Sequence, residues 1–165
     1  MGNTMKQIKA AKITAILLFI LYAAVMLYLL FFRRLLLNGP ALPAEQDYFR
    51  ALADRFEPVP FRTVTEFIGR VEKISVSDLA FRNLVGNVVL FIPLGIFLPL
   101  IFPKQRRLPV LLITVAGIIS IVELTQMFTL LGTCDIDDLI LNTAGAAAGF
   151  GIYKLICRIR TTPTE

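Results

Sequence analysis

Two carboxylic acids lie in or directly beside long apolar runs of the chain. Glu123 is the only charged residue in the run 109–131, and Asp138 directly precedes the apolar run 139–157. A charge at the centre of a bilayer costs about 2.5–3.5 kcal/mol, so an acid that persists there usually faces a cavity or a partner. Both residues are therefore candidates for function. If the protein is an enzyme, they are its candidate catalytic residues, with Glu123 as the acid or base.

Other polar residues follow at spacings of three or four, which places them on one face of a helix. Ser120 and Gln126 flank Glu123 in this way, and a second series runs from Asp135 to Asn142. We expect these side chains to meet near the outer membrane surface in one polar cup. Its candidate ligand-binding residues are Arg62, Arg82, Asn87, Glu123, Gln126, Asp135, Asp138 and Asn142.

The acidic run between positions 135 and 138 allows more than one interpretation. Its carboxylates could bind a ligand, cap the helix that follows, or lie in a solvated turn. Asp135, Asp137 and Asp138 also supply the oxygen ligands that Mg²⁺ and Ca²⁺ prefer. The metal hypothesis is that these carboxylates bind one of the two ions, and no other cofactor is expected. The amides of the cup have an alternative role too, because they could tie neighbouring helices together by hydrogen bonds.

The composition narrows the chemistry further. The 165 residues include no histidine, which excludes a Ser-His-Asp or Cys-His pair and a histidine-ligated zinc site. Cys134 has no base beside it in the sequence, so we expect it to be inert. The net charge of +5 does not indicate nucleic acid as a partner, because the basic residues lie beside the apolar runs, as membrane topology predicts.

The elements that must position these residues are transmembrane helices. Hydrophobic residues make up 56% of the chain and charged residues 18%, and the mean hydropathy is +0.73. Apolar runs of about twenty residues, the length that crosses a bilayer, recur at 13–32, 83–103, 109–131 and 139–157. We therefore predict an all-α polytopic membrane protein of one domain with four transmembrane helices. The first run is expected to be retained, since a signal peptide has a shorter apolar core.

Lysine and arginine in the short loops indicate the orientation. They lie in the tail 1–12, in the loop 103–109 and toward the end 158–165, whereas the turn 132–138 has none. Both termini are therefore predicted to be cytoplasmic, and the loop 33–82 extracytoplasmic. Apolar residues at helical spacing in that loop predict amphipathic helices on the membrane surface, with a small solvated cap as the alternative.

Four motifs resemble the VanZ-like family, in the family's order and with similar gaps. They are Pro60-Phe61-Arg62-Thr63, Asn87-Val-Val-Leu-Phe91-Ile-Pro93-Leu-Gly95, Glu123-Leu-Thr-Gln126 and Asp135-Ile-Asp137-Asp138-Leu-Ile-Leu-Asn142-Thr-Ala-Gly145. The resemblance covers about residues 58–153, and it carries the family's polar positions onto the cup residues from 87 to 142. Many relatives have an arginine just before the acidic run, where this chain has Gly132-Thr133-Cys134. Arg62 or Arg82 would then supply the cation.

The resemblance implies a bacterial protein of the cytoplasmic membrane and cell envelope, in a family associated with resistance to teicoplanin, a lipidated glycopeptide. The first hypothesis is a protein that binds or modulates an outer-leaflet lipid, a cell-wall precursor or a lipoglycopeptide through its outward cup. The alternative is an intramembrane hydrolase or transferase for a lipid-linked envelope substrate, with Glu123 as acid or base and a metal ion as an optional aid. The enzyme ranks second because no nucleophile is recognisable among the acids, and a transporter ranks third.

Overall fold

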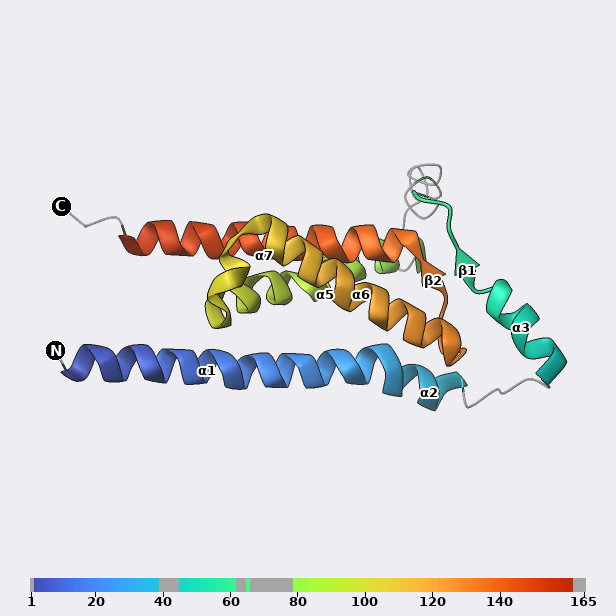
Figure 1. Ribbon diagram of the computed structural model, residues 1–165, viewed down its shortest axis with the longest axis horizontal. Coiled ribbons are helices and arrows are strands. Elements are labelled where there is room, and N and C mark those ends of the chain that lie inside the picture. The colour runs from blue at the N-terminus through green and yellow to red at the C-terminus, as the bar shows by residue number, and fades with distance from the viewer. Residues whose placement is uncertain (1, 39–44, 62–64, 66–78, 162–165) are drawn as a thin grey trace.

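The computed structural model describes residues 2–38, 45–61, 65 and 79–161, arranged as Figure 1 shows. Arg62 and most of the amphipathic stripe predicted in the loop 33–82 lie outside the described residues, and so does the side chain of Arg82. The expectations that rest on these residues stay predictions.

The described chain is almost wholly helical, which confirms the all-α prediction. A π-helical turn, η1, joins the first two helices, and η3 is a 3₁₀ turn. In chain order the elements are α1 (Gly2–Leu27), η1 (Tyr28–Phe32), α2 (Arg33–Asn38), α3 (Glu45–Ala53), β1 (Phe56–Glu57), α5 (Leu79–Ile101), η3 (Pro103–Arg106), α6 (Leu108–Phe128), β2 (Cys134–Asp135) and α7 (Ile136–Thr161).

Within the described residues, three helical stretches are long and apolar enough to cross a membrane. They are Lys9–Phe32, Leu108–Phe128 and Ile136–Ile159, and they correspond to the first, third and fourth predicted spans. The second predicted span corresponds to α5, whose apolar described part, Val85–Ile101, is shorter. The backbone of α5 stays helical through Pro93 and Pro99, so the polypeptide does not leave the helical path there.

Helices α5 and α7 lie backbone against backbone. A Cβ atom added at Gly145 would lie 2.2 Å from the carbonyl oxygen of Val88, and one at Gly149 would lie 2.0 Å from that of Ile92. On the other side, a Cβ atom at Gly95 would lie 1.9 Å from the carbonyl oxygen of Ala146. Small residues permit such an approach between membrane helices. On α7 the close contacts fall in the sequence Gly145-Ala-Ala-Ala-Gly149, in which every side chain is small.

The remaining core is apolar and centres on α6. Leu111, Val115 and Ile119 recur every four residues and are fully buried, because that face of α6 turns toward α5 and α7. Helix α1 is much less enclosed than the others. Only 6% of its apolar stretch is buried, against 33% of the corresponding stretch of α7. Most of the surface of α1 is therefore left to its surroundings.

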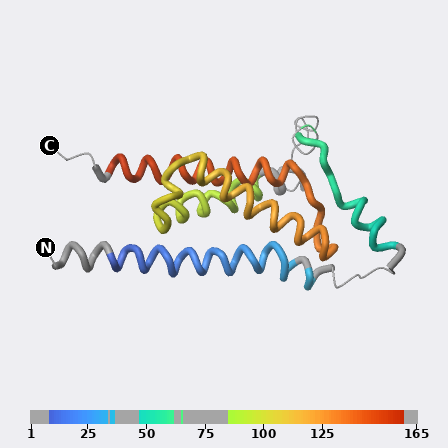
Figure 2. Tube along the Cα trace, viewed as in Figure 1, coloured from blue at the N-terminus to red at the C-terminus, as the bar shows by residue number. Residues whose placement is uncertain are grey.

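The two ends of the bundle differ. Both termini lie at one end, and α3, β1 and β2 lie at the other (Figures 1 and 2). Strands β1 and β2 pair in parallel, with Phe56 opposite Cys134 and Glu57 opposite Asp135. The Tyr48 hydroxyl donates to the carbonyl oxygen of Phe128 at 2.9 Å. The segment 45–57 is thereby fastened over the turn between α6 and α7.

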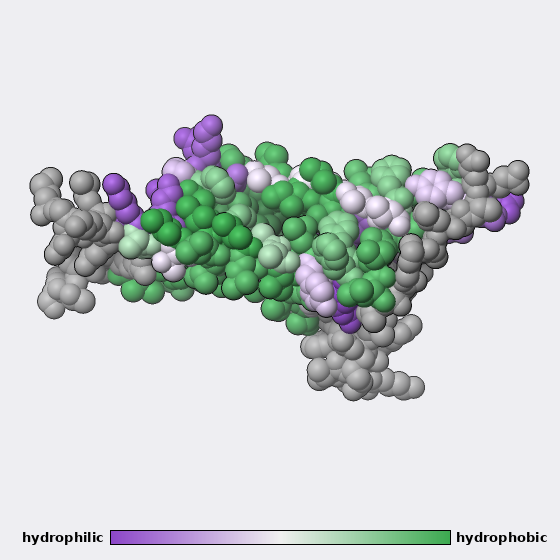
Figure 3. Space-filling view, turned by 90° about the horizontal axis from the view of Figure 1, so that it is seen from below, coloured by the Kyte–Doolittle hydropathy of each residue, from purple (hydrophilic) through white to green (hydrophobic). Residues whose placement is uncertain are grey.

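The surface of the bundle suits a hydrocarbon environment. Apolar residues cover the middle of the face in Figure 3, and hydrophilic residues gather mostly toward its ends. Large side chains such as Leu17, Ile113 and Ile121 are more than half exposed. Apolar surface of this extent is typical of a membrane-embedded bundle, in which lipid replaces water around the helices.

Candidate functional site

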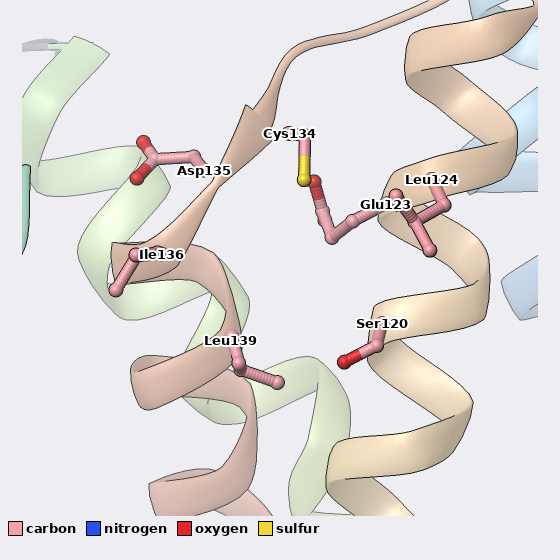
Figure 4. Close-up of a pocket in the computed structure, with 7 residues that line it drawn as sticks. All are labelled: Ser120, Glu123, Leu124, Cys134, Asp135, Ile136 and Leu139. Atoms are coloured by element: carbon pink, nitrogen blue, oxygen red, sulfur yellow. The ribbon is translucent and has the colours of Figure 1, made fainter. Parts of the chain in front are cut away.

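A cavity lies between α6 and the start of α7, beneath β2 (Figure 4). Its volume is about 180 Å³. Glu123 is 6% exposed, whereas the adjacent lining residue Leu124 is 42% exposed, so the cavity extends from the interior to the surface of the bundle. The residues that line it are Ser120, Glu123, Leu124, Cys134, Asp135, Ile136 and Leu139.

Within the cavity the Glu123 side chain and the Cys134 sulfur point toward each other (Figure 4). The Asp135 carboxylate points the other way, across β2. Partial burial raises the pKa of the Cys134 thiol, and the negative charges of Glu123 and Asp135 raise it further. Cys134 is therefore a protonated thiol near neutral pH, which is a poor nucleophile.

The carboxylates of the acidic run accept hydrogen bonds from three different places. The Asp137 backbone N–H donates to Asp135 Oδ1 at 2.8 Å, which makes Asp135 the N-cap of α7. The Phe61 backbone N–H donates to Asp137 Oδ1. The Asn87 side-chain amide donates to Asp138 Oδ1. The cap that the sequence analysis offered as an alternative role for Asp135 is thus present, and Asp137 positions the chain after β1.

Asp138 lies at the contact between α5 and α7, and it is not among the residues that line the cavity. Asn142 follows one turn later on the same face of α7 and is 5% exposed. Its Oδ1 atom has no hydrogen-bond partner among the described residues. The single cup expected from the sequence is therefore two groups. One surrounds the cavity beside Glu123, and the other joins α5 to α7 through Asn87 and Asp138.

Gln126 serves the helix packing. It is 1% exposed, and its Nε2 atom donates to the carbonyl oxygen of Leu30 in η1 at 3.1 Å. Its own backbone carbonyl accepts the N–H groups of Leu131 at 2.9 Å and Gly132 at 3.1 Å, which ends α6. Gln126 thus ties α6 to η1, the turn that follows α1, which is the alternative role predicted for the amides.

Arg55 reaches the turn that precedes the acidic run. Its Nη1 atom donates to the carbonyl oxygen of Gly132 at 3.3 Å, and its backbone carbonyl accepts the Cys134 N–H at 2.8 Å. The sequence predicts Arg62 or Arg82 as the cation of this neighbourhood, and the structure adds Arg55. Two-residue strands have no recognisable sequence pattern, so nothing in the sequence indicated that this segment would pair beside Cys134.

Two residues that line the cavity, Ser120 and Cys134, are not among the candidate residues predicted from the sequence. Ser120 lies three residues before Glu123, and that spacing was a sufficient signal for its inclusion. For Cys134, the fold brings the Glu123 carboxyl to the thiol from another helix. The residues next to Cys134 in the sequence do not indicate this contact.

The metal hypothesis for the acidic run stays a prediction. No three side chains of the types that ligate metals come together within the described part of the chain. Asp135, Asp137 and Asp138 instead accept hydrogen bonds from an adjacent turn, from Phe61 and from Asn87.

The fold and the cavity define a multi-helix membrane protein with a buried carboxyl group on the wall of a cavity near one end of its bundle. The chain belongs to the VanZ/LLP1 family, whose sequence profile matches residues 19–157. One relative, Protein VanZ from Enterococcus faecium, is 34% identical over 75 residues, which are 46% of this chain and 46% of that protein. The match thus spans less than half of the relative's length. No solved structure matches the chain significantly. The family resemblance read from the four motifs is confirmed.

Proposed function

We propose that the protein binds or modulates an outer-leaflet lipid, a cell-wall precursor or a lipoglycopeptide through the cavity beside Glu123. The observation that carries this proposal is a carboxyl group 6% exposed on the wall of a cavity of about 180 Å³ that opens beside Leu124. A buried acid is costly in an apolar bundle, and such residues usually serve a binding or reaction site. Its natural complement is a ligand amine or a bridging cation.

The proposed topology has four spans in a bacterial cytoplasmic membrane, with both termini cytoplasmic. Basic residues at the end with the termini support this orientation, as do the uncharged residues of the turn from Leu130 to Cys134. Helix α5 would then be the short second span. In this arrangement the cavity faces the outer leaflet, and segment 45–57 is extracytoplasmic and covers the turn next to it.

Family membership supports the choice of ligands. The family is associated with teicoplanin resistance, and teicoplanin carries both charged groups and a lipid tail. Such a molecule would approach the cavity from the outer membrane surface. We infer that its polar part is recognised near Glu123, while Arg55 at the adjacent turn offers a cation for an acidic group.

An intramembrane hydrolase or transferase is the second candidate. The observation that favours it is the Cys134 thiol facing the Glu123 carboxyl, since a carboxylate could take a proton from a nucleophile. The raised pKa of Cys134 argues for the binding function, because a protonated thiol attacks slowly.

The substitution Glu123→Gln tests the proposal. It removes the charge while keeping the shape of the side chain, so binding of teicoplanin to the purified protein in lipid nanodiscs should weaken about 10- to 100-fold, the value of about 1.5–3 kcal/mol for a charged hydrogen bond. Asp54→Asn, at an exposed acid of the α3–β1 segment, is the matched control and should bind normally.

The same pair of variants separates the two candidates. Envelope lipids from cells with and without the protein are compared by mass spectrometry. A lipid product that depends on Glu123 would establish the enzyme and overturn the binding function. Equal teicoplanin binding by the two variants would show that the cavity does not recognise this ligand's charge.

A further inference from the structure

A second concavity lies on the other side of α6, between α1, α5 and α6. Its volume is about 230 Å³. Along α1 it extends from Phe19 to Leu30, and it is closed by Phe91 and Leu94 of α5 and by Ile118 and Val122 of α6. We call it the α1 groove. All its lining side chains in the described part of the chain are aliphatic or aromatic.

Polar contacts hold α1 beside this groove without filling it. The Tyr22 hydroxyl donates to the carbonyl oxygen of Leu90 at 2.8 Å, and Gln126 Nε2 donates to the carbonyl oxygen of Leu30 at 3.1 Å. The ring of Tyr22 also packs on that of Phe97, with centroids 6.0 Å apart. These contacts fix the distance of α1 from the bundle, so the groove is a built feature of the fold.

We propose that the α1 groove binds one acyl chain of a membrane lipid. The groove lies within the apolar stretches of α1 and α6, so hydrocarbon rather than water surrounds it. Water finds no polar partners on an apolar wall, and an empty groove forfeits the dispersion contacts of its lining. A lipid chain is the hydrocarbon that is present at this depth.

The dimensions of the groove fit that occupant. Phe19 and Leu30 are eleven positions apart, which corresponds to about 16 Å of helix rise, close to half the thickness of the hydrocarbon core. An engineered apolar cavity of about 150 Å³ holds benzene, and the groove is larger. A helix with its side chains is about 10–12 Å across and would not enter a space of this volume.

The groove is distinct from the cavity beside Glu123. Ile118 and Val122 line the groove, whereas Ser120, Glu123 and Leu124 line the cavity on the opposite side of the same helix. The inference therefore does not depend on the function proposed for Glu123, and the two can fail separately.

Two neighbouring alanines of α1 provide a matched test. Ala23 lines the groove, and Ala24 is exposed. The purified protein is placed in nanodiscs of phosphatidylglycerol and phosphatidylethanolamine that contain a phospholipid with a photoactivatable diazirine on one acyl chain. After irradiation, mass spectrometry locates and counts the lipid adducts. The wild-type protein should carry adducts concentrated on the groove lining.

The phenyl ring of Ala23→Phe occupies the space of several methylenes, so groove adducts should fall about tenfold. Ala24→Phe should leave them unchanged. Val122→Phe and Ile121→Phe form a second pair, on α6, because Val122 lines the groove and Ile121 is 67% exposed. This pair keeps the test decisive if Ala23→Phe does not fold.

Three outcomes would overturn the proposal. One is equal lipid labelling of the groove in both variants of a pair. Another is an even spread of adducts over all lipid-exposed residues of the wild-type protein. The third is cross-linking of the groove to a second copy of the chain in place of lipid, which would make it a contact between copies. A drop confined to the groove-filling variants supports the acyl-chain site.

Discussion

At the scale of single residues, the surroundings of each carboxylate determine its role. Asp135, Asp137 and Asp138 are close in sequence, yet they respectively cap α7, hold the Phe61 backbone and bind Asn87. Glu123 is different because it faces a cavity with open volume. The functional candidate among these acids is therefore the one whose immediate space is available to a ligand.

The reactivity of the Cys134 thiol can be used to test the charges that line the cavity. Its pKa is raised by burial first and then by the carboxylates of Glu123 and Asp135. In a protein with Cys157→Ser, alkylation of Cys134 by iodoacetamide should therefore accelerate only at a higher pH than for an ordinary cysteine, because the thiolate is the reactive form. Adding Glu123→Gln removes a negative charge, so the pKa should fall and alkylation at a given pH should become faster.

The control for this measurement is Asp54→Asn, which removes a charge from an exposed position outside the cavity. It should leave the pH dependence of alkylation where it was. An unchanged profile in the Glu123→Gln variant would mean that Glu123 and Cys134 do not face each other.

At the scale of helices, the contact between α5 and α7 organises the bundle. Its small residues allow the carbonyl groups of one helix to approach the backbone of the other, and dispersion contacts accumulate along the seam. Asn87 and Asp138 close one end of this seam with a side-chain hydrogen bond. Helix α6 then packs its Leu111, Val115 and Ile119 face on the pair.

Two glycines of α7 test this view. A Cβ atom at Gly149 would lie 2.0 Å from the carbonyl oxygen of Ile92, so Gly149→Ala must push the helices apart and should cost about 1–3 kcal/mol or more. A Cβ atom at Gly151 meets nothing within 4 Å, so Gly151→Ala should be neutral or add up to about 1 kcal/mol. Thermal unfolding in detergent measures both. Equal melting temperatures for the two variants would contradict the close seam.

At the scale of the whole molecule, the bundle is asymmetric. One end carries both termini, and the other carries the cavity, the β1–β2 pair and the segment 45–57 fastened over it. The lightly enclosed α1 leaves a lipid-accessible groove on one side of α6, while the cavity of Glu123 lies on the other. Both concavities occur in the half of the molecule away from the termini.

The orientation of this bundle is open to direct measurement. The loop charges predict that the cavity end is extracytoplasmic. A membrane-impermeant maleimide added to intact cells should therefore label Cys134 in a Cys157→Ser protein. It should label Cys157 in a Cys134→Ser protein only after the cells are permeabilised. The reverse pattern would place the Glu123 cavity at the cytoplasmic face and remove outer-leaflet ligands from consideration.

The sequence by itself determined the class of the protein. Helix length and hydropathy are local properties, so three spans, the shorter apolar helix and the small-residue face of α7 could all be predicted from consecutive residues. The four motifs identified the family for a similar reason, because order and spacing along the chain are sequence properties. Glu123 also stands out in the sequence as an acid within an apolar run, and in the structure it is buried.

Only the tertiary structure decided which of these residues share a space. Steps of three residues turn a helix by about 60° each, so Ser120, Glu123 and Gln126 fan out over about 120° and can reach different neighbours. Glu123 lines the cavity, whereas Gln126 donates a hydrogen bond to Leu30 in η1. Arg55 and Cys134 came together through a strand pair of two residues each. Such contacts depend on how distant helices and loops pack, and packing is not encoded in any local pattern.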